Sequence, residues 1–200
     1  MLDKSTNFVA NPQHIIHQLP AGLIQGDTRT ELFGCRKTKR VFVLSNGQTV
    51  SFKNLNQPLK ALILQKMLAD EKAMLDLRHL AVDDALENFA FCVFGSADAY
   101  ADFDEKGNLK EGDNFICGKK NCTCYTWASK KISVDGNELT PREIEIVQLF
   151  ASDLADKQIA DLLHISVSTL NSHKSNIFDK FSVNSKSGLT RKAIEQKIVQ

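Results

Sequence analysis

The order of hydrophobic and polar positions divides the chain into two unlike parts near residue 133. Before this point, alternating β-prone runs are mixed with stretches whose apolar residues recur at helical spacing. After it, short amphipathic helices follow one another closely. We therefore expect an α+β domain over residues 1–132 and an all-α domain over residues 133–200, joined at the turn-forming run from Ser133 to Asn137.

The N-terminal part contains a strong signal for a β-hairpin. Two β-prone runs, 41–44 and 49–52, flank Asn46 and Gly47. An Asn-Gly pair readily adopts the positive φ angles of the tight turn between antiparallel strands, so the sequence predicts a hairpin at this place.

Helical spacing follows the hairpin. A helix is predicted to begin after Pro58, and its apolar pattern extends to Leu77. A second helix is predicted over residues 82–94. Residues 95–127 are rich in Gly, Asp, Asn and Cys and lack a strong period, so we expect loops with short strands there.

Four helices are predicted in the C-terminal part. The first begins at Pro141, because Thr140 can cap it and Glu143 stands at the third helical position, which completes a capping box. The others are predicted over 156–163, 167–181 and 185–198, and Ser166 is placed to cap the third.

The third of these helices has one apolar face and one polar face. The inward positions are Val167, Leu170, Ile177 and Phe181. The outward positions are Ser168, Thr169, Asn171, Ser172, Ser175 and Asn176, with Lys174 and Lys180 as cations. Two short helices joined by a tight turn place such a helix in the major groove, and short polar side chains allow it to approach base edges closely.

Three stretches of this part, from Leu139 to Val147, from Asp156 to Leu163 and from Ile165 to Phe181, closely resemble the LuxR/GerE family of DNA-binding domains. The resemblance covers about the last 60 residues. It implies a four-helix LuxR-type helix-turn-helix domain whose third helix enters the major groove and whose fourth often supports dimerisation. It also implies that Lys157 and Ser166 lie near phosphates and that Thr169, Asn171, Ser172, Lys174 and Ser175 face the DNA.

The sequence departs from the family pattern at four positions. Asn171 stands where the family commonly has a lysine, which weakens phosphate attraction at that place. Asp153 replaces a usual glycine, and Lys186 replaces a usual arginine. Ala155 stands where a Ser or Thr would cap the second helix.

Charge and composition limit the function. The chain has a formal net charge of +1, and the eight Lys/Arg and nine Asp/Glu from Val134 onward give −1. DNA affinity must therefore depend on where the charges lie. No nucleophile motif or phosphate-cradling glycine loop suggests an enzyme, and no apolar run suggests a signal peptide or membrane span.

We therefore expect a cytoplasmic, sequence-specific transcription regulator that binds double-stranded DNA as a homodimer, with RNA polymerase as a candidate partner. The N-terminal part would sense a signal or mediate assembly. The alternative is a protein-interaction adaptor that keeps the helix-turn-helix fold but binds DNA weakly. A less favoured alternative is an enzyme that uses a Cys/His pair in the N-terminal part.

The cysteines suggest a second site. Their odd number and the lack of a secretion signal argue against a disulfide framework. Cys117, Cys122 and Cys124 lie in a Gly/Asn-rich loop, 117–124, and could bind one zinc ion. The candidates for a fourth ligand are Cys92, Cys35 and His79. Two alternatives stay open: redox sensing, favoured by the neighbouring lysines at 119 and 120, and a set of unrelated reduced thiols.

Two weaker patterns have ordinary explanations. Residues 102–113 faintly suggest a calcium loop, but Lys106 occupies a ligand position and a simple turn is favoured. The basic run 36–40 could touch DNA backbone or a partner, or it could be a solvated strand edge protected by lysines.

Overall fold

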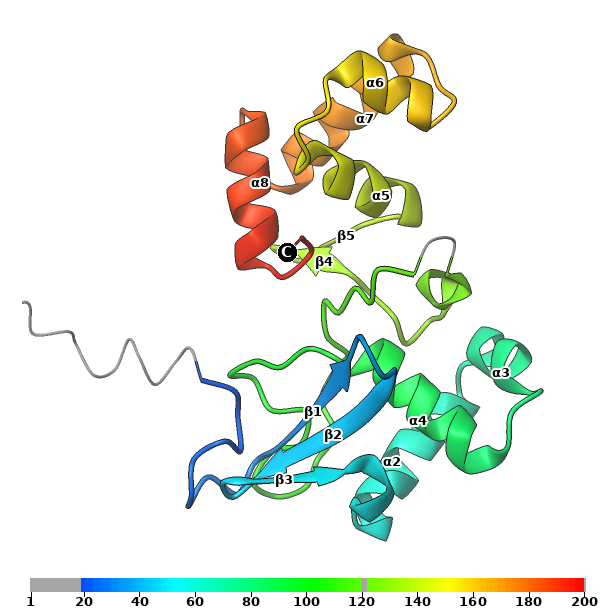
Figure 1. The fold of residues 1–200 in the computed structure, drawn as a ribbon, viewed down its shortest axis with the longest axis vertical. Helices are drawn as coiled ribbons and strands as arrows, with labels where there is room; N and C mark the ends of the chain where they lie inside the picture. Colours follow the sequence, from blue (N-terminus) through cyan, green and yellow to red (C-terminus); the bar gives the residue numbers. More distant parts are fainter. Residues whose placement is uncertain (1–18, 120–121, 200) are drawn as a thin grey trace, which may run out of the picture.

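The computed structural model describes residues 19–119 and 122–199. It has an N-terminal region of strands and helices and a helical C-terminal region (Figure 1). The N-terminal elements are β1 (Thr30–Cys35), β2 (Arg40–Ser45), β3 (Gln48–Ser51), the 3₁₀ turn η1 (Phe52–Asn54), α2 (Gln57–Leu68), α3 (Glu71–Leu77), α4 (Val82–Val93) and the 3₁₀ turn η2 (Thr123–Thr126). The C-terminal elements are β4 (Ser133–Val134), β5 (Asn137–Glu138), α5 (Pro141–Phe150), α6 (Asp156–Leu162), α7 (Val167–Lys180) and α8 (Lys186–Glu195).

The N-terminal region is built on an antiparallel sheet of order β1-β2-β3. The predicted hairpin is confirmed: β2 and β3 are joined at Asn46 and Gly47, whose φ angles are 50° and 74°. The sequence did not predict β1. Its Glu31 is fully buried and interrupts the apolar pattern that would mark a strand. The pairing of β1 with the predicted strand β2 is seen only in the structure.

The predicted continuation of the first helix to Leu77 is wrong. The helix ends at Leu68, and Asp70 starts a new helix by accepting a hydrogen bond from the Ala73 N–H at 3.1 Å. An aspartate at an N-cap satisfies a backbone donor that would otherwise have no partner, so it favours a break over a continuous helix. The predicted helix 82–94 is confirmed as α4.

Two clusters of buried hydrophobic side chains hold the molecule together. The first packs α2, α3 and α4 against the sheet, and its fully buried members include Phe89, Phe94 and Phe103. The second lies among the C-terminal helices around Phe150 and Phe181. Its members Ile116 and Ile132 precede residue 133, so the second core draws on residues assigned by sequence to the first domain. The boundary at 133 stays a prediction.

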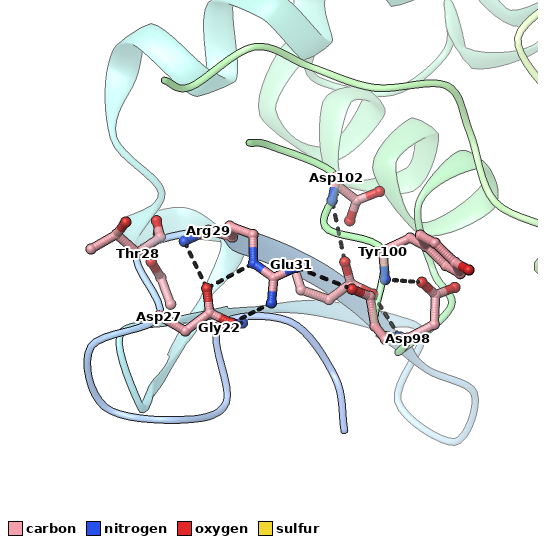
Figure 2. A network of polar contacts seen from close by, with 10 residues as sticks. Gly22, Asp27, Thr28, Arg29, Glu31, Asp98, Tyr100 and Asp102 are labelled. Carbon is pink, nitrogen blue, oxygen red and sulfur yellow. Dashed lines mark hydrogen bonds and ion pairs between the residues drawn. The ribbon is translucent and has the colours of Figure 1, made fainter. Parts of the chain in front are cut away.

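A group of carboxylates fastens the loop after α4 to the sheet (Figure 2). The backbone N–H groups of Asp98 and Asp102 donate to the Glu31 carboxylate at 2.7 and 3.2 Å. The Leu32 N–H donates to Asp102 Oδ2 at 2.7 Å. The second oxygen of Asp102, Oδ1, is buried without a hydrogen-bond partner among the described residues.

Burial of these acids favours their neutral form. Burial raises the pKa of Glu31 to about 9, and nearby acidic side chains add to the shift. Burial and the charge of Asp98 raise the pKa of Asp113 to about 7. The pKa of Asp102 is also raised, first by burial and then by the charges of Asp113 and Glu31.

The run from Ser133 to Asn137, expected to be a turn or linker, forms most of a small hairpin. β4 and β5 pair in antiparallel fashion, and Asp135 and Gly136 turn between them with φ angles of 48° and 80°. Across the described ranges 19–119 and 122–199, no helix has the length and apolar character needed to cross a membrane.

Candidate nucleic-acid interface

The start of α5 is fixed by the predicted capping box. The Glu143 N–H donates to Thr140 Oγ1 at 3.2 Å, and the Thr140 N–H donates to Glu143 Oε2 at 2.7 Å. Lys180 Nζ, at the end of α7, also lies 2.7 Å from Glu143 Oε2. Burial opposes the charge of Glu143, but the hydrogen bonds from Lys180 and Thr140 outweigh it and lower the pKa. This carboxylate therefore joins the start of α5 to the end of α7.

The turn between α6 and α7 is tight. His164 has a φ of 52°, in the left-handed region that commonly ends a helix, and the Ile165 N–H donates back to the Ala160 carbonyl at 3.0 Å. Ser166 then caps α7 as predicted, since its Oγ accepts from the Thr169 N–H at 3.0 Å. These contacts set the direction in which α7 leaves the turn.

Asp156, the first residue of α6, connects this helix to both neighbours. Its carboxylate lies 2.8 Å from Lys174 Nζ on α7 and 4.0 Å from Lys186 Nζ on α8. Both ammonium groups also lie over the Phe150 ring, at 5.7 and 5.5 Å from its centroid. Lys174 and Lys186 thus connect α7 and α8 to α6 through ion pairs with Asp156, and to α5 through cation–π contacts with Phe150.

The polar face of α7 is exposed. Leu170, Ile177 and Phe181 are buried, as predicted. The predicted inward position of Val167 is wrong, because this side chain is 43% exposed at the start of the helix. The residues predicted to face DNA that are exposed are Lys157, Ser166, Ser168, Thr169, Asn171, Ser172, Ser175 and Asn176.

Lys174 differs from the other residues predicted to face DNA. It is half-buried, and its ammonium is held by Asp156. Its contact with DNA stays a prediction, whereas its contact with α6 is direct. Sequence reasoning missed this pairing, because Asp156 and Lys174 are 18 positions apart and lie on different helices.

Other lysines of this region also have acidic partners. Lys180 pairs with Glu143, and Lys192 contacts the Asp135 carboxylate. Lys157, by contrast, is exposed at the second position of α6. Several cations of this near-neutral region are therefore held in internal ion pairs.

The cysteines predicted to bind metal also come together. Cys122 and Cys124 lie with their sulfurs 3.2 Å apart. The thiol of Cys92, at the end of α4, contacts both of them, and the thiol of Cys117 contacts Cys122. The other candidates for a fourth ligand lie elsewhere: the Cys35 thiol contacts Thr38, and His79 is exposed after α3.

The four thiols have unequal acidity. The contact with Cys117 lowers the pKa of Cys122 to about 6, and the contacts with Cys122 and Cys92 lower that of Cys124 to about 4. The pKa of Cys92 and that of Cys117 are raised, chiefly by thiol contacts with Cys122. Cys122 thus accepts from Cys117 and donates to Cys124, so the thiols form one connected group.

Comparison with known proteins identifies the C-terminal part. Residues 137–193 match the family described as bacterial regulatory proteins, luxR family. The C-terminal part of the chain is therefore a LuxR-family helix-turn-helix domain, which confirms the resemblance found in the sequence.

Two relatives illustrate the similarity. The oxygen regulatory protein NreC of Staphylococcus carnosus is 38% identical over 95 residues, which cover 44% of this chain and 44% of that protein. The oxygen regulatory protein NreC of Staphylococcus aureus is 37% identical over 62 residues, covering 31% of this chain and 29% of that protein. The chain thus spans less than half the length of these curated relatives. No solved structure matches it significantly.

Proposed function

We propose that the protein is a sequence-specific DNA-binding transcription regulator, and not an enzyme, in which α5 to α8 act as a four-helix LuxR-type domain. The observation that carries this proposal is the exposed face of α7, which presents short hydrogen-bonding side chains while its opposite face is buried. Such a face can approach base edges closely in the major groove.

Two successive parts of the N-terminal half of α7 have different tasks in this proposal. Ser166 and Ser168 stand at the N-terminus of the helix, where free N–H groups and the helix dipole favour a phosphate. Lys157 adds an exposed positive charge at the start of α6. Asn171, one turn further along, can donate to and accept from adenine at the same time.

We infer that the protein acts as a homodimer on DNA. Two copies related by a twofold axis would place their α7 helices roughly 34 Å apart, which matches one turn of the duplex. Contact with RNA polymerase is a further expectation for a regulator of this kind.

The test begins with duplexes selected by the full chain from a random pool. Asn171→Ala should lose about 1–3 kcal/mol of preference for the selected base at one position in each half-site. Lys157→Ala should weaken binding to all duplexes alike and make the salt dependence shallower. Gln148→Ala, which removes an exposed amide on α5, is the matched control and should bind like the parent. Unchanged preference in Asn171→Ala would place the reading surface elsewhere.

The adaptor alternative rests on the paired lysines and the formal charge of −1 from Val134 onward. The salt dependence of DNA binding distinguishes the regulator from the adaptor. A regulator should bind its selected duplex with an affinity that falls steeply between low and moderate salt, whereas an adaptor should enrich no duplex from the pool.

A further inference from the structure

Four cysteine thiols from separate parts of the chain meet beside the first hydrophobic core. Cys92 comes from the last turn of α4, Cys117 from the loop that follows Phe115, and Cys122 and Cys124 from the start of η2. Cys92 and Cys124 are buried, while Cys117 and Cys122 are half-buried, and all four are free thiols. Cys92 is 25 positions or more from the others, so the fold itself brings it to the group.

The cluster is held from the side of the sheet by the basic run after β1. Arg36 Nε donates to the Ile116 carbonyl at 3.0 Å, and its guanidinium lies 4.8 Å from the centroid of the Phe115 ring. Lys39 Nζ donates to the Cys117 carbonyl at 3.4 Å. The basic run is therefore more than a solvated strand edge, because two of its side chains hydrogen-bond to the segment that carries Cys117.

A buried cation lies beneath the thiols. Lys130 is only 4% exposed, and its ammonium donates to the carbonyl oxygens of Cys92 and Phe115. Carbonyl oxygens carry no net charge, so a buried ammonium also requires anions nearby. Thiolates at Cys92 and Cys124 would supply such anions.

We propose that Cys92, Cys117, Cys122 and Cys124 bind one zinc ion as four thiolates. Binding would release the protons of these thiols to solvent and form four Zn–S bonds. Four thiolates and Zn²⁺ carry a net charge of −2, which the nearby Lys130, Lys39 and Arg36 offset.

The present side-chain positions require a small adjustment to hold the ion. In the parts of the chain that the structure describes, no group of three or more His, Cys, Asp or Glu side chains is already arranged around a metal position. The sulfurs of Cys122 and Cys124 are 3.2 Å apart, whereas tetrahedral ligands at about 2.3 Å from zinc lie roughly 3.8 Å from one another. Side-chain rotation can open this gap without moving α4 or η2.

The site would also connect the two cores. Cys92 and Cys124 belong to the first hydrophobic cluster, whereas Ile116 and Tyr125, each adjacent to a proposed ligand, pack against the second. Zinc would therefore fix the segment that leads from the N-terminal region into the LuxR-family domain. This role fits a structural site, because a zinc ion that joins segments of the chain contributes its binding free energy to the stability of the fold.

The experiment measures metal per chain in full-length protein purified under reducing conditions without chelator. The parent and Cys35→Ser should each hold about one zinc, since Cys35 lies outside the cluster. Cys92→Ser should bind zinc at least about 100-fold more weakly, a larger loss than removal of an outer-shell partner causes. Full zinc content and unchanged affinity in Cys92→Ser would overturn the four-ligand assignment.

A second measurement uses the parent protein, so that it still tests the proposal if the cysteine variants fail to fold. Chelated parent protein, checked for helix content, is titrated with Co²⁺, which should give intense tetrahedral absorption and thiolate charge-transfer bands at one equivalent. Folded parent protein that gives neither signal and leaves all five thiols open to modification would overturn the proposal. A disulfide among these four cysteines in folded, air-exposed protein that takes up no metal would also overturn it and point to redox sensing.

Discussion

The two regions of the molecule differ in the distance along the chain over which their defining contacts form. In the C-terminal region, the capping contacts of α5 and α7 each join residues three positions apart, Thr140 with Glu143 and Ser166 with Thr169. In the N-terminal region, the Leu32 N–H donates to Asp102 and the Val41 N–H to Glu87, across 70 and 46 positions. One region is specified locally, while the other depends on contacts that exist only in the folded chain.

This difference has a functional counterpart. A locally specified helical domain can be attached to many different partners without losing its fold. The N-terminal region instead places its ionisable groups, the buried carboxylates and the thiol cluster, at points where distant segments meet. A signal that changes such a group changes how segments pack, which is the property a sensing region needs.

The largest expected effect on stability comes from removing one buried aromatic ring from each hydrophobic core in turn. Phe94→Ala and Phe150→Ala each remove a fully buried ring and should cost about 3–5 kcal/mol. Trp127, the one tryptophan, stacks on Phe89 in the first core at 5.7 Å, so its fluorescence reports that region. In urea titrations, Phe94→Ala should strongly lower the midpoint of the unfolding transition followed by Trp127 fluorescence. Phe150→Ala should lower mainly the midpoint followed by the circular dichroism of the helices.

Equal shifts of both signals in both variants would contradict the contrast between the regions. They would mean that Ile116 and Ile132, which pack in the second cluster from the N-terminal side, join the two cores into one cooperative unit.

The next largest effect is the change of stability with pH that the buried carboxylic acids cause. Burial raises the pKa of Asp113 to about 7 from an ordinary value of 3.8, so the folded state holds this proton more tightly than the unfolded chain. The stabilisation is complete below about pH 4 and is lost as the pH rises through 7, and Glu31 extends the loss toward pH 9. The free energy of unfolding should thus fall between pH 5 and 8, by an amount on the order of 2 kcal/mol.

Asp113→Asn gives the matched control, because the amide keeps an oxygen to accept from the Ser96 N–H but cannot ionise. Urea titrations at several pH values should show a flatter profile for this variant. A parent profile that rises from pH 5 to 8 would mean that these carboxylates are ionised and paired in the folded protein.

The same contrast explains how much of the fold the sequence could predict. The capping box at Thr140 and the turn at Asn46 were predicted correctly, since each is a short run of residues with its own conformational preference. Strand β1 was missed because buried Glu31 gains its partners from Asp98 and Asp102, far along the chain. The break at Asp70 was missed because an apolar period continues on both sides of it.

The candidate sites follow the same division. Helical period alone placed the polar face of α7 on the surface, and the structure has those side chains exposed. Helical period could not show that Lys174 forms an ion pair with Asp156. Nor could it show that Lys130, one of two adjacent lysines, is buried and donates to the Cys92 carbonyl. Cys92 was one of three candidates for the fourth metal ligand. Only the fold shows that the Cys92 thiol contacts the other cysteines, whereas the thiol of Cys35, another candidate beside His79, contacts Thr38.

The smallest effect tests the local character of the C-terminal region. Ala155 stands at the N-cap of α6 with extended backbone angles, and its N–H donates to Gln158 Oε1 at 2.9 Å. Only the return hydrogen bond, from the Gln158 N–H to a cap side chain, is missing. Ala155→Ser would supply it and should stabilise the protein by about 1 kcal/mol in urea unfolding. Ala151→Ser, at the C-terminal end of α5, adds the same hydroxyl without a capping role and should bring no gain. Equal stability of Ala155→Ser and the parent would show that α6 is positioned by the Asp156–Lys174 ion pair and not by its cap, which would make this end of the domain depend on distant contacts as the N-terminal region does.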